Sequence, residues 1–277
     1  ISQPMKADFA TDTLWCTGLE DRFISASNVP NLNRATYNWR FSDGSKATGR
    51  NVKKTFNTAG QYTAELRIND RGCFDSVIYE FDVENSPDAE FATSDGCEFD
   101  SITFTNTSSI NTNSSITGYS WDFGDSTFST QKDVSHIYSM YDTVYVKLEV
   151  FADNGCSNLD SKRVVINPKP DASFDLAKNC DLLEFDFTDK STITMGTISS
   201  RNWDFGDNTQ GSGTNLSHSY SQDGTYSVEL QIESNAGCRD TAMMSLLNNS
   251  TLEARFGVSN LCRFEDFDIS DKIGRAS

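Results

Sequence analysis

The sequence predicts an all-β protein built from repeated two-sheet sandwiches, and three observations lead to this prediction. Apolar and polar residues alternate with a period of two, as in 101–105, 183–187 and 226–232, which is typical of strands with one buried face. No stretch sustains the 3.6-residue period of a helix between capping residues. Tryptophan and cysteine recur at fixed intervals along the chain. Strands with one apolar face cover one another in layers, so a sandwich is expected.

The chain of 277 residues is organised as a repeat of about 82 residues. Trp39, Trp121 and Trp203 stand 82 residues apart, and the intervals between the seven cysteines alternate between 57–59 and 24 residues. A unit of this length is large enough to be a small domain. The predicted units are 1–85, 86–168 and 169–250, and 251–277 is predicted to be the N-terminal part of a fourth.

Each unit is predicted to hold about seven short strands, as an immunoglobulin-like sandwich does. Turn-forming clusters at 42–44, 123–125, 153–155 and 211–213 separate the alternating segments. The one tryptophan that each unit carries inside an alternating strand indicates a buried core residue. Tandem sandwiches joined by short linkers, two of which contain proline, predict a stiff rod.

The cysteines predict disulfides and an oxidising compartment. The chain has no Cys-x-x-Cys and only two histidines, which disfavours a zinc or thioredoxin-like site. Pairing inside each unit is favoured, because closing a loop of nearly 60 residues stabilises a small domain by on the order of 4 kcal/mol. Pairing across the linkers, such as Cys73 with Cys97, is the alternative. The favoured pairs are Cys16–Cys73, Cys97–Cys156 and Cys180–Cys238, which leave Cys262 over.

Composition limits the partners. The chain has 40 acidic residues against 23 lysines and arginines, a net charge of −17, which argues against a nucleic-acid or anionic-membrane partner. No apolar run approaches the ~20 residues of a membrane span, and the first residues contain no signal-peptide apolar segment. Motifs of common hydrolases and nucleotide-binding enzymes are absent, so the chain is predicted not to be an enzyme.

Three motifs recur in register in units two and three: a Trp-Asp-Phe-Gly-Asp turn at 121–125 and 203–207, a histidine two residues before a tyrosine at 136–138 and 218–220, and a late Tyr-x-Val-x-Leu-like strand at 145–150 and 226–230. Together they resemble the polycystic-kidney-disease (PKD) domain. Unit one departs from the pattern, because Arg40 replaces the first aspartate of the turn and Lys54 replaces the histidine. The motif residues, predicted to be structural, are Trp39, Trp121, Asp122, Gly124, Asp125, His136, Trp203, Asp204, Gly206, Asp207 and His218.

The resemblance implies a non-catalytic spacer or adhesive rod at the cell surface. The cysteine placement is similar to tandem PKD units of large secreted Bacteroidota surface proteins, including adhesins linked to gliding motility and type IX secretion. The expected partners are neighbouring PKD-type domains of the same or other chains, in a rod or filament, and extracellular protein or polysaccharide. An alternative from the same resemblance is a spacer or carbohydrate-contacting arm of a secreted polysaccharide- or protein-degrading enzyme.

Two groups of charged residues are candidate binding sites. No cofactor is required, but the turn carboxylates Asp122, Asp125, Asp204 and Asp207 are candidates for Ca²⁺, with hydrogen bonding to the local backbone as the alternative. Unit one has a net charge of −1, against −8 and −7 for the next two. The lysines and arginines of unit one are predicted to form a basic face that contacts an acidic unit of the same or another chain. The alternative is that they are simply solvated. These cations are Arg40, Lys46, Arg50, Lys53 and Lys54.

Overall fold

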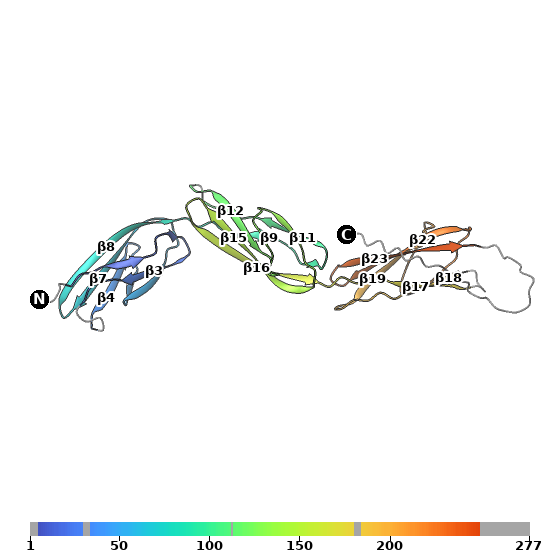
Figure 1. Ribbon diagram of the computed structural model, residues 1–277, viewed down its shortest axis with the longest axis horizontal. Helices are drawn as coiled ribbons and strands as arrows, with labels where there is room; N and C mark the ends of the chain where they lie inside the picture. Colours follow the sequence, from blue (N-terminus) through green and yellow to red (C-terminus); the bar gives the residue numbers. More distant parts are fainter. Residues whose placement is uncertain (1–4, 30–33, 112, 180–183, 250–277) are drawn as a thin grey trace, which may run out of the picture. The chain divides into compact units, whose positions relative to one another are not determined.

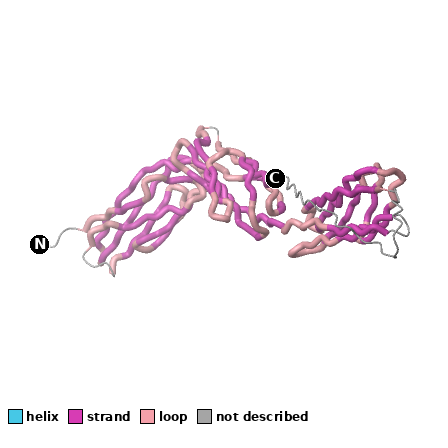
Figure 2. The backbone as a smooth tube through the Cα atoms, turned by 45° about the vertical axis from the view of Figure 1, so that its right-hand side comes forward, coloured by secondary structure: helices cyan, strands magenta, loops and turns pink. Residues whose placement is uncertain are grey.

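The computed structural model describes residues 5–29, 34–111, 113–179 and 184–249, and all regular structure in these ranges is β-strand (Figure 2). The chain divides into two compact units, Ile1–Ile166 and Asn167–Ser277. The first unit contains two sandwiches and the second contains one. The predicted fourth unit, 251–277, lies outside the described residues. Among the described residues, no helix is long and apolar enough to cross a membrane.

The first sandwich consists of a three-stranded and a five-stranded sheet (Figure 1). The smaller sheet has the order β1 (Phe9–Thr11), β3 (Glu20–Ser25), β6 (Asn51–Thr55). The larger sheet has the order β2 (Trp15–Cys16), β8 (Cys73–Glu84), β7 (Gly60–Asp70), β4 (Thr36–Phe41), β5 (Lys46–Thr48). All pairs are antiparallel except β2 with β8, which is parallel.

The second sandwich repeats this topology. Its smaller sheet has the order β14 (Val134–Ile137), β11 (Ser101–Asn106), β9 (Phe91–Ala92). Its larger sheet has the order β10 (Gly96–Cys97), β16 (Ser157–Asn167), β15 (Asp142–Ala152), β12 (Ile116–Asp122), β13 (Phe128–Ser129).

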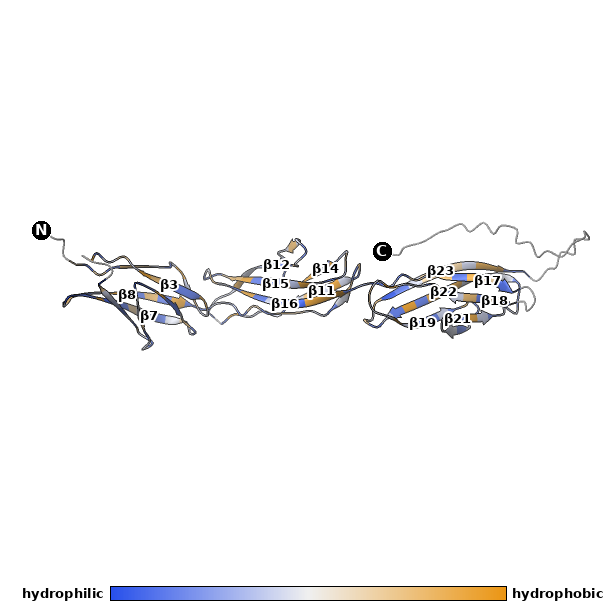
Figure 3. Cartoon of the chain, turned by 90° about the horizontal axis from the view of Figure 1, so that it is seen from below, coloured by the Kyte–Doolittle hydropathy of each residue, from blue (hydrophilic) through white to orange (hydrophobic). Residues whose placement is uncertain are grey.

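In the third sandwich the described strands again form two sheets. The smaller has the order β17 (Phe174–Asn179), β18 (Glu184–Asp189), β21 (Asn215–His218). The larger has the order β20 (Gln210–Ser212), β19 (Ile198–Asp204), β22 (Gly224–Ser234), β23 (Arg239–Asn248). Apolar and polar residues alternate along these strands, as Figure 3 shows by colour. The all-β prediction is therefore confirmed.

Each sandwich closes around its tryptophan. Trp39, Trp121 and Trp203 are at most 1% exposed, and each ring meets a phenylalanine of the first strand at 4.9–5.1 Å between centroids. Each indole N–H donates to a backbone carbonyl ten residues further on, at 2.8–2.9 Å. The indole therefore fills the space between the sheets and satisfies its one polar group, as a buried tryptophan requires.

The first sandwich carries a carboxylate in its core. Asp21 of β3 is 4% exposed, and its Oδ2 has no hydrogen-bond partner. The corresponding residues of the other two sandwiches are the buried Ile102 and Phe185. Burial, together with the nearby charge of Asp12, raises the pKa of Asp21 to about 6. The folded first sandwich therefore disfavours the ionised form of this group.

We expect Asp21→Asn to stabilise the first sandwich at pH 7 by about 3 kcal/mol, since folding raises the pKa from 3.8 to about 6 and each pKa unit corresponds to about 1.4 kcal/mol. The folded-state pKa lies above the unfolded value, so the stability associated with neutral Asp21 is complete below about pH 4 and is lost as the pH rises through about 6. Thermal unfolding measured from pH 4 to 7 should show this loss in the unaltered chain and not in the variant. Asp82→Asn, at an exposed position of β8, is the matched control. Equal pH profiles for the unaltered chain and Asp21→Asn would contradict the prediction.

Candidate functional site: the turn carboxylates and the bridged junction

The Trp-Asp-Phe-Gly-Asp turn of the second sandwich places a carboxylate against a histidine. Asp125 Oδ1 accepts hydrogen bonds from the backbone N–H and the hydroxyl of Thr127, at 3.0 and 2.5 Å. Asp125 Oδ2 lies 2.7 Å from His136 Nε2. The imidazole stacks on Phe123 at 4.3 Å and meets the edge of Tyr138 at 4.5 Å. These contacts join the turn, the strand that carries His136 and the aromatic core in one cluster.

The third sandwich repeats the cluster at equivalent residues. Asp207 accepts from Thr209 at 3.0 and 2.5 Å and lies 2.8 Å from His218 Nε2. His218 stacks on Phe205 at 4.3 Å, and Tyr220 donates its hydroxyl to the Phe205 carbonyl at 2.9 Å. A nucleophilic triad would need the hydroxyl to face the imidazole and the carboxylate to orient that imidazole from behind. Here the Thr209 hydroxyl does lie 3.4 Å from His218 Nε2, but Asp207 contacts this same nitrogen and also accepts from the hydroxyl, so the carboxylate does not orient the imidazole from behind.

The first sandwich keeps the same contact with different residues. Asp43 occupies the position of Asp125, and Lys54 occupies that of His136; their ion pair measures 2.6 Å. The Lys54 ammonium also lies over the rings of Phe41 and Phe56, at 5.8 and 5.3 Å. Lysine can supply a cation and a hydrogen-bond donor but cannot replace imidazole as a neutral metal ligand. The repeated feature is therefore a latch in which a turn carboxylate meets a side-chain nitrogen of the facing sheet.

Hydrogen bonding lowers the pKa of each latch carboxylate. Burial raises the pKa of Asp125 and Asp207, but hydrogen bonds from the neighbouring threonine and histidine outweigh burial, so both pKa values lie below the ordinary value. In the first sandwich, burial is outweighed by hydrogen bonds from Lys54 and Ser45, which lower the pKa of Asp43 to about 2. The ionised carboxylate is therefore the form that the fold favours.

We expect Asp207→Asn to destabilise the third sandwich by about 1–3 kcal/mol at pH 7, because it weakens charge-assisted hydrogen bonds at a partly buried position. The folded-state pKa of Asp207 is depressed, so its contribution is present above about pH 4 and is lost as the pH falls through the folded-state value. Urea unfolding with pulse proteolysis, followed on peptides from 198–248, measures this sandwich separately. Asp175→Asn on β17 is the control, since Asp175 is largely exposed. A variant whose stability matches that of the unaltered chain at every pH would contradict the prediction.

The two leading aspartates of the turns also accept local hydrogen bonds. Asp122 Oδ1 accepts from the Gly124 N–H at 3.0 Å, and Asp204 Oδ1 accepts from the Gly206 N–H at 2.8 Å. Gly206 has φ +78°, and a Cβ there would lie 2.6 Å from the Ser227 carbonyl oxygen, so the turn requires glycine. Within the described ranges, no group of three or more histidine, cysteine, aspartate or glutamate side chains is arranged to hold a metal ion. Calcium binding stays a prediction, and calorimetric titration of metal-stripped protein, with Asp204→Ala as the variant, is its test.

The basic residues of the first sandwich do not form one free face. Lys53 pairs with Glu20 at 2.5 Å, and Lys54 belongs to the latch. Arg40 and Lys46 stand opposite each other on β4 and β5, are exposed and form no ion pair among the described residues, as is also true of Arg50. Two of the five predicted cations are therefore already neutralised within their own sandwich.

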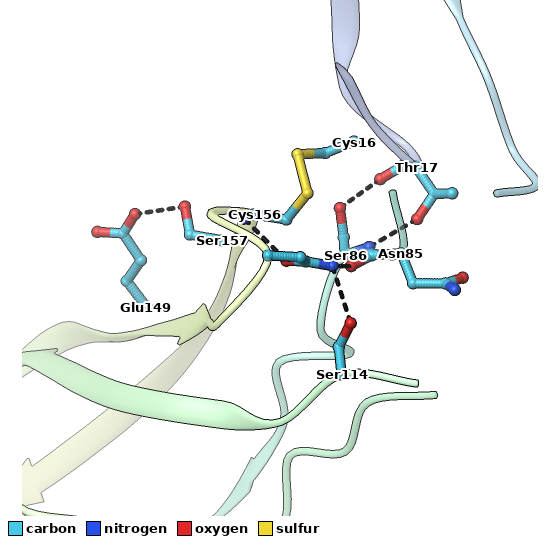
Figure 4. Close-up of a disulfide and its surroundings, with 9 residues drawn as sticks. Cys16, Thr17, Asn85, Ser86, Ser114, Glu149, Cys156 and Ser157 are labelled. Carbon is cyan, nitrogen blue, oxygen red and sulfur yellow. Dashed lines mark hydrogen bonds between the residues drawn. A yellow bond between two sulfur atoms is a disulfide. The ribbon is translucent and has the colours of Figure 1, made fainter. Parts of the chain in front are cut away.

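The predicted partners of the cysteines are wrong in both pairs that can be compared. Cys16 is bonded to Cys156 in the next sandwich (Figure 4), with a Cα–Cα distance of 5.8 Å. Cys73 is an exposed free thiol. Cys97, the predicted partner of Cys156, is in another disulfide, as is Cys238. Pairing of Cys73 with Cys97 across the linker is therefore also wrong. Cys180 and Cys262 lie outside the described residues.

Strand length explains why pairing inside a unit fails. Cys16 pairs in β2 with Glu84, at the end of β8, whereas Cys73 begins that strand. Eleven residue steps at ~3.3 Å separate Cys73 from Glu84 by about 36 Å, while a disulfide requires a Cα–Cα distance below about 7 Å. The second sandwich is built in the same way, since Asp95, just before β10, accepts from Val165 near the end of β16, and Cys156 precedes the start of β16.

Hydrogen bonds surround the disulfide at the junction (Figure 4). Asn154 Nδ2 donates to the Asn85 carbonyl at 2.9 Å and to Ser114 Oγ at 3.2 Å, and its Oδ1 accepts from the Cys156 N–H. On the other side, Ser86 donates two hydrogen bonds to Thr17, from its backbone N–H to the Thr17 hydroxyl at 2.9 Å and from its own hydroxyl to the Thr17 carbonyl at 2.7 Å. The linker residues 85–86 are thus held to both sandwiches next to the bond.

The hairpin turn of the second sandwich is shaped to approach the first. Gly155 has φ +86°, and a Cβ at this position would lie 3.2 Å from Leu14 Cδ2, close to the preceding strand β2. The absence of a side chain and the left-handed backbone let the turn contact Leu14 closely. Two neighbouring covalent connections, the linker and the disulfide, therefore join the first and second sandwiches. The sequence did not predict this junction, although it contains cysteines 140 residues apart and the Asn154-Gly155-Cys156 turn.

Comparison with known proteins agrees with the fold and the turn motifs. The PKD domain family matches residues 2–80, 84–167 and 165–246. The PKD1 domain of Vibrio anguillarum Epp is 28% identical, over 29% of this chain and 94% of that one, with a TM-score of 0.28. The PKD1 domain of the Vibrio cholerae metalloprotease PrtV is 28% identical, over 30% of this chain and 99% of that one, also with a TM-score of 0.28. Because family matches cover most of the chain in three successive segments, it belongs to the PKD domain family as a tandem array.

Proposed function

We propose that this chain is a non-catalytic structural segment of a secreted protein, in which bridged PKD sandwiches carry load and hold other regions at a distance. The observation that supports it most strongly is the Cys16–Cys156 disulfide, which lies beside the linker it reinforces. PKD domains are generally non-catalytic and, like disulfides, typical of extracellular proteins. A large surface protein of the Bacteroidota adhesin kind is the context that we propose for it.

The covalent connectivity has a mechanical consequence. Two domains joined by a linker alone move relative to each other unless their interface is large and apolar. With the disulfide closed, tension applied at the two chain ends passes from Cys16 directly to Cys156 and bypasses the residues between them. Most of both sandwiches, including the tryptophan cores, is then shielded from the applied force. A spacer under repeated tension needs this property, whereas an enzyme arm that only positions a substrate does not.

Single-molecule stretching of the full chain, held at its two termini, tests the proposal. Cys16 and Cys156 are 140 positions apart, and an extended chain spans ~3.3–3.6 Å per residue, so reduction should release at least about 460 Å of additional length. Cys73→Ser, which removes only the free thiol, should behave as the unaltered chain in both states. Equal extension before and after reduction would overturn the load-bearing function.

Binding to a panel of polysaccharides separates this function from that of a carbohydrate-contacting arm. We expect no saturable binding by the oxidised chain in affinity electrophoresis. Saturable binding that survives reduction of the disulfides would favour the hydrolase-arm alternative and contradict our proposal.

A further inference from the structure

Three cysteines stand at the same place in the three sandwiches, immediately after the turn of the last hairpin. Each follows a turn glycine with φ between +84° and +86°. In the second and third sandwiches the cysteine carbonyl accepts a hydrogen bond from the backbone N–H of the residue that closes the hairpin, Ala152 or Ser234. In the first sandwich Cys73 is the strand partner of Asp70. The glycine–cysteine pairs are Gly72 with Cys73, Gly155 with Cys156, and Gly237 with Cys238.

Two of these hairpin cysteines are in disulfides, and the third is not. Cys156 is bonded to the cysteine that follows the first strand of the preceding sandwich, and Cys238 is also bonded. Cys73 is exposed and free. Its own sandwich offers no partner, because Cys16 is used by Cys156 and lies at the far end of β8. The partner that corresponds to Cys16 would come from a sandwich that contacts the opposite end of the first one.

The hairpin that presents Cys73 is held by side-chain hydrogen bonds, as is the bonded hairpin of the second sandwich. In the second sandwich, Asp153 supports the hairpin by accepting from the N–H and hydroxyl of Ser115, at 3.1 and 2.7 Å. In the first sandwich a different carboxylate does so: Asp70, which pairs with Cys73, is 5% exposed and accepts two hydrogen bonds from Arg34, at 2.5 and 2.7 Å. Folding therefore leaves the position of the Cys73 backbone little freedom.

The surface beside Cys73 carries an exposed apolar side chain. Phe74 is 74% exposed, and the corresponding residue of the second sandwich is the polar Ser157. The chain reaches this end of the sandwich near Ala7, whose N–H donates to Asp75 Oδ2 at 2.7 Å. A linker from a neighbouring sandwich that enters here would pass Cys73, as residues 85–87 pass Cys156.

We propose that Cys73 is a covalent coupling site for another PKD-type sandwich, through a disulfide with the cysteine that follows the first strand of that sandwich. The proposal rests on the structural function above and names its partner. The chemistry is thiol–disulfide exchange: the Cys73 thiol loses its proton and attacks the partner cysteine, which arrives as a mixed disulfide with a small thiol. One S–S bond forms, one breaks, and the small thiol leaves, so no net oxidant is consumed.

The experiment places a second copy of residues 86–167 directly ahead of residue 5 of the otherwise full chain. In this added copy, Cys156 is changed to serine, so that its Cys97 is the available first-strand cysteine. After refolding in a glutathione redox buffer, we expect the free thiol of Cys73 to disappear. Non-reducing peptide mapping should then find Cys73 bonded to Cys97 of the added copy in most molecules.

One control separates a specific site from a merely accessible thiol. Cys73→Ser combined with Ser76→Cys moves the thiol three residues along β8 to another exposed position. We expect at least tenfold less bonding from this position. Equal bonding from both positions, or Cys73–Cys73 dimers, would each overturn the proposal.

A second fusion guards against misfolding of the added copy. It uses residues 5–85 with Cys73→Ser, so that Cys16 is the available first-strand cysteine. Bonding of this Cys16 to Cys73 of the full chain is expected, and absence of bonding in both fusions would overturn the proposal. The stretching experiment depends on the Cys16–Cys156 bond and not on Cys73, so failure of the coupling site leaves its outcome unchanged.

Discussion

Cys156→Ser is expected to lower the free energy of unfolding of the first two sandwiches by about 4–5 kcal/mol under oxidising conditions. The disulfide closes a sequence separation of 140 residues, and the chain-entropy relation gives about this value for loops of this length. If only the first sandwich unfolds, its chain is still anchored at Cys16 and at the linker, so a loop of about 70 residues gives a similar value.

Urea unfolding followed by pulse proteolysis, on peptides from 5–166, measures this effect. Cys73→Ser provides the matched control, because it removes a cysteine that has no bond, and its stability should change by less than about 0.5 kcal/mol. Reducing agent should lower the stability of the unaltered chain at least as far as Cys156→Ser does, because it also breaks the disulfide that Cys97 forms. If Cys156→Ser unfolds at the same urea concentration as the unaltered oxidised chain, the disulfide does not stabilise these sandwiches.

Trp203→Ala is expected to destabilise the third sandwich by about 3–5 kcal/mol. The side chain is 1% exposed, contacts Phe174 and Phe187 at 5.0 and 5.7 Å, and donates to the Gly213 carbonyl at 2.9 Å. Truncation leaves a cavity between the sheets and an unpaired carbonyl. A sandwich of about 80 residues has a total stability of only several kcal/mol, so a large fraction of this variant should be unfolded at 25 °C.

Hydrogen exchange of peptides within 198–248 provides the measurement. The exchange of β7 and β8 in the first sandwich should be unchanged in the same sample, which serves as an internal control. Trp203→Phe keeps an aromatic ring in the core and should lose less stability than Trp203→Ala. Retention of full protection in Trp203→Ala would show that the tryptophan is not the centre of this core.

The repeat explains why the fold was predictable. A tryptophan recurs every 82 residues inside an alternating strand, and in the second and third units the same turn and tyrosine follow it. These patterns are local, because strand alternation and turn chemistry depend on residues close in sequence. The latch of the first sandwich was less visible, since Lys54 replaces histidine and pairs with Asp43, a contact that depends on how the two sheets face each other.

The sequence by itself determined the all-β class, the three PKD matches and the burial tendency of the tryptophans, because each depends on patterns within one repeat. Only the tertiary structure decided which cysteines meet. Spacing along the chain favoured bonds within a unit, but β8 carries Cys73 and Cys16 to opposite ends of the same sandwich. A strand of twelve residues is rigid and about 36 Å long, so the nearest cysteine in sequence is out of reach, and the neighbouring sandwich supplies the partner instead.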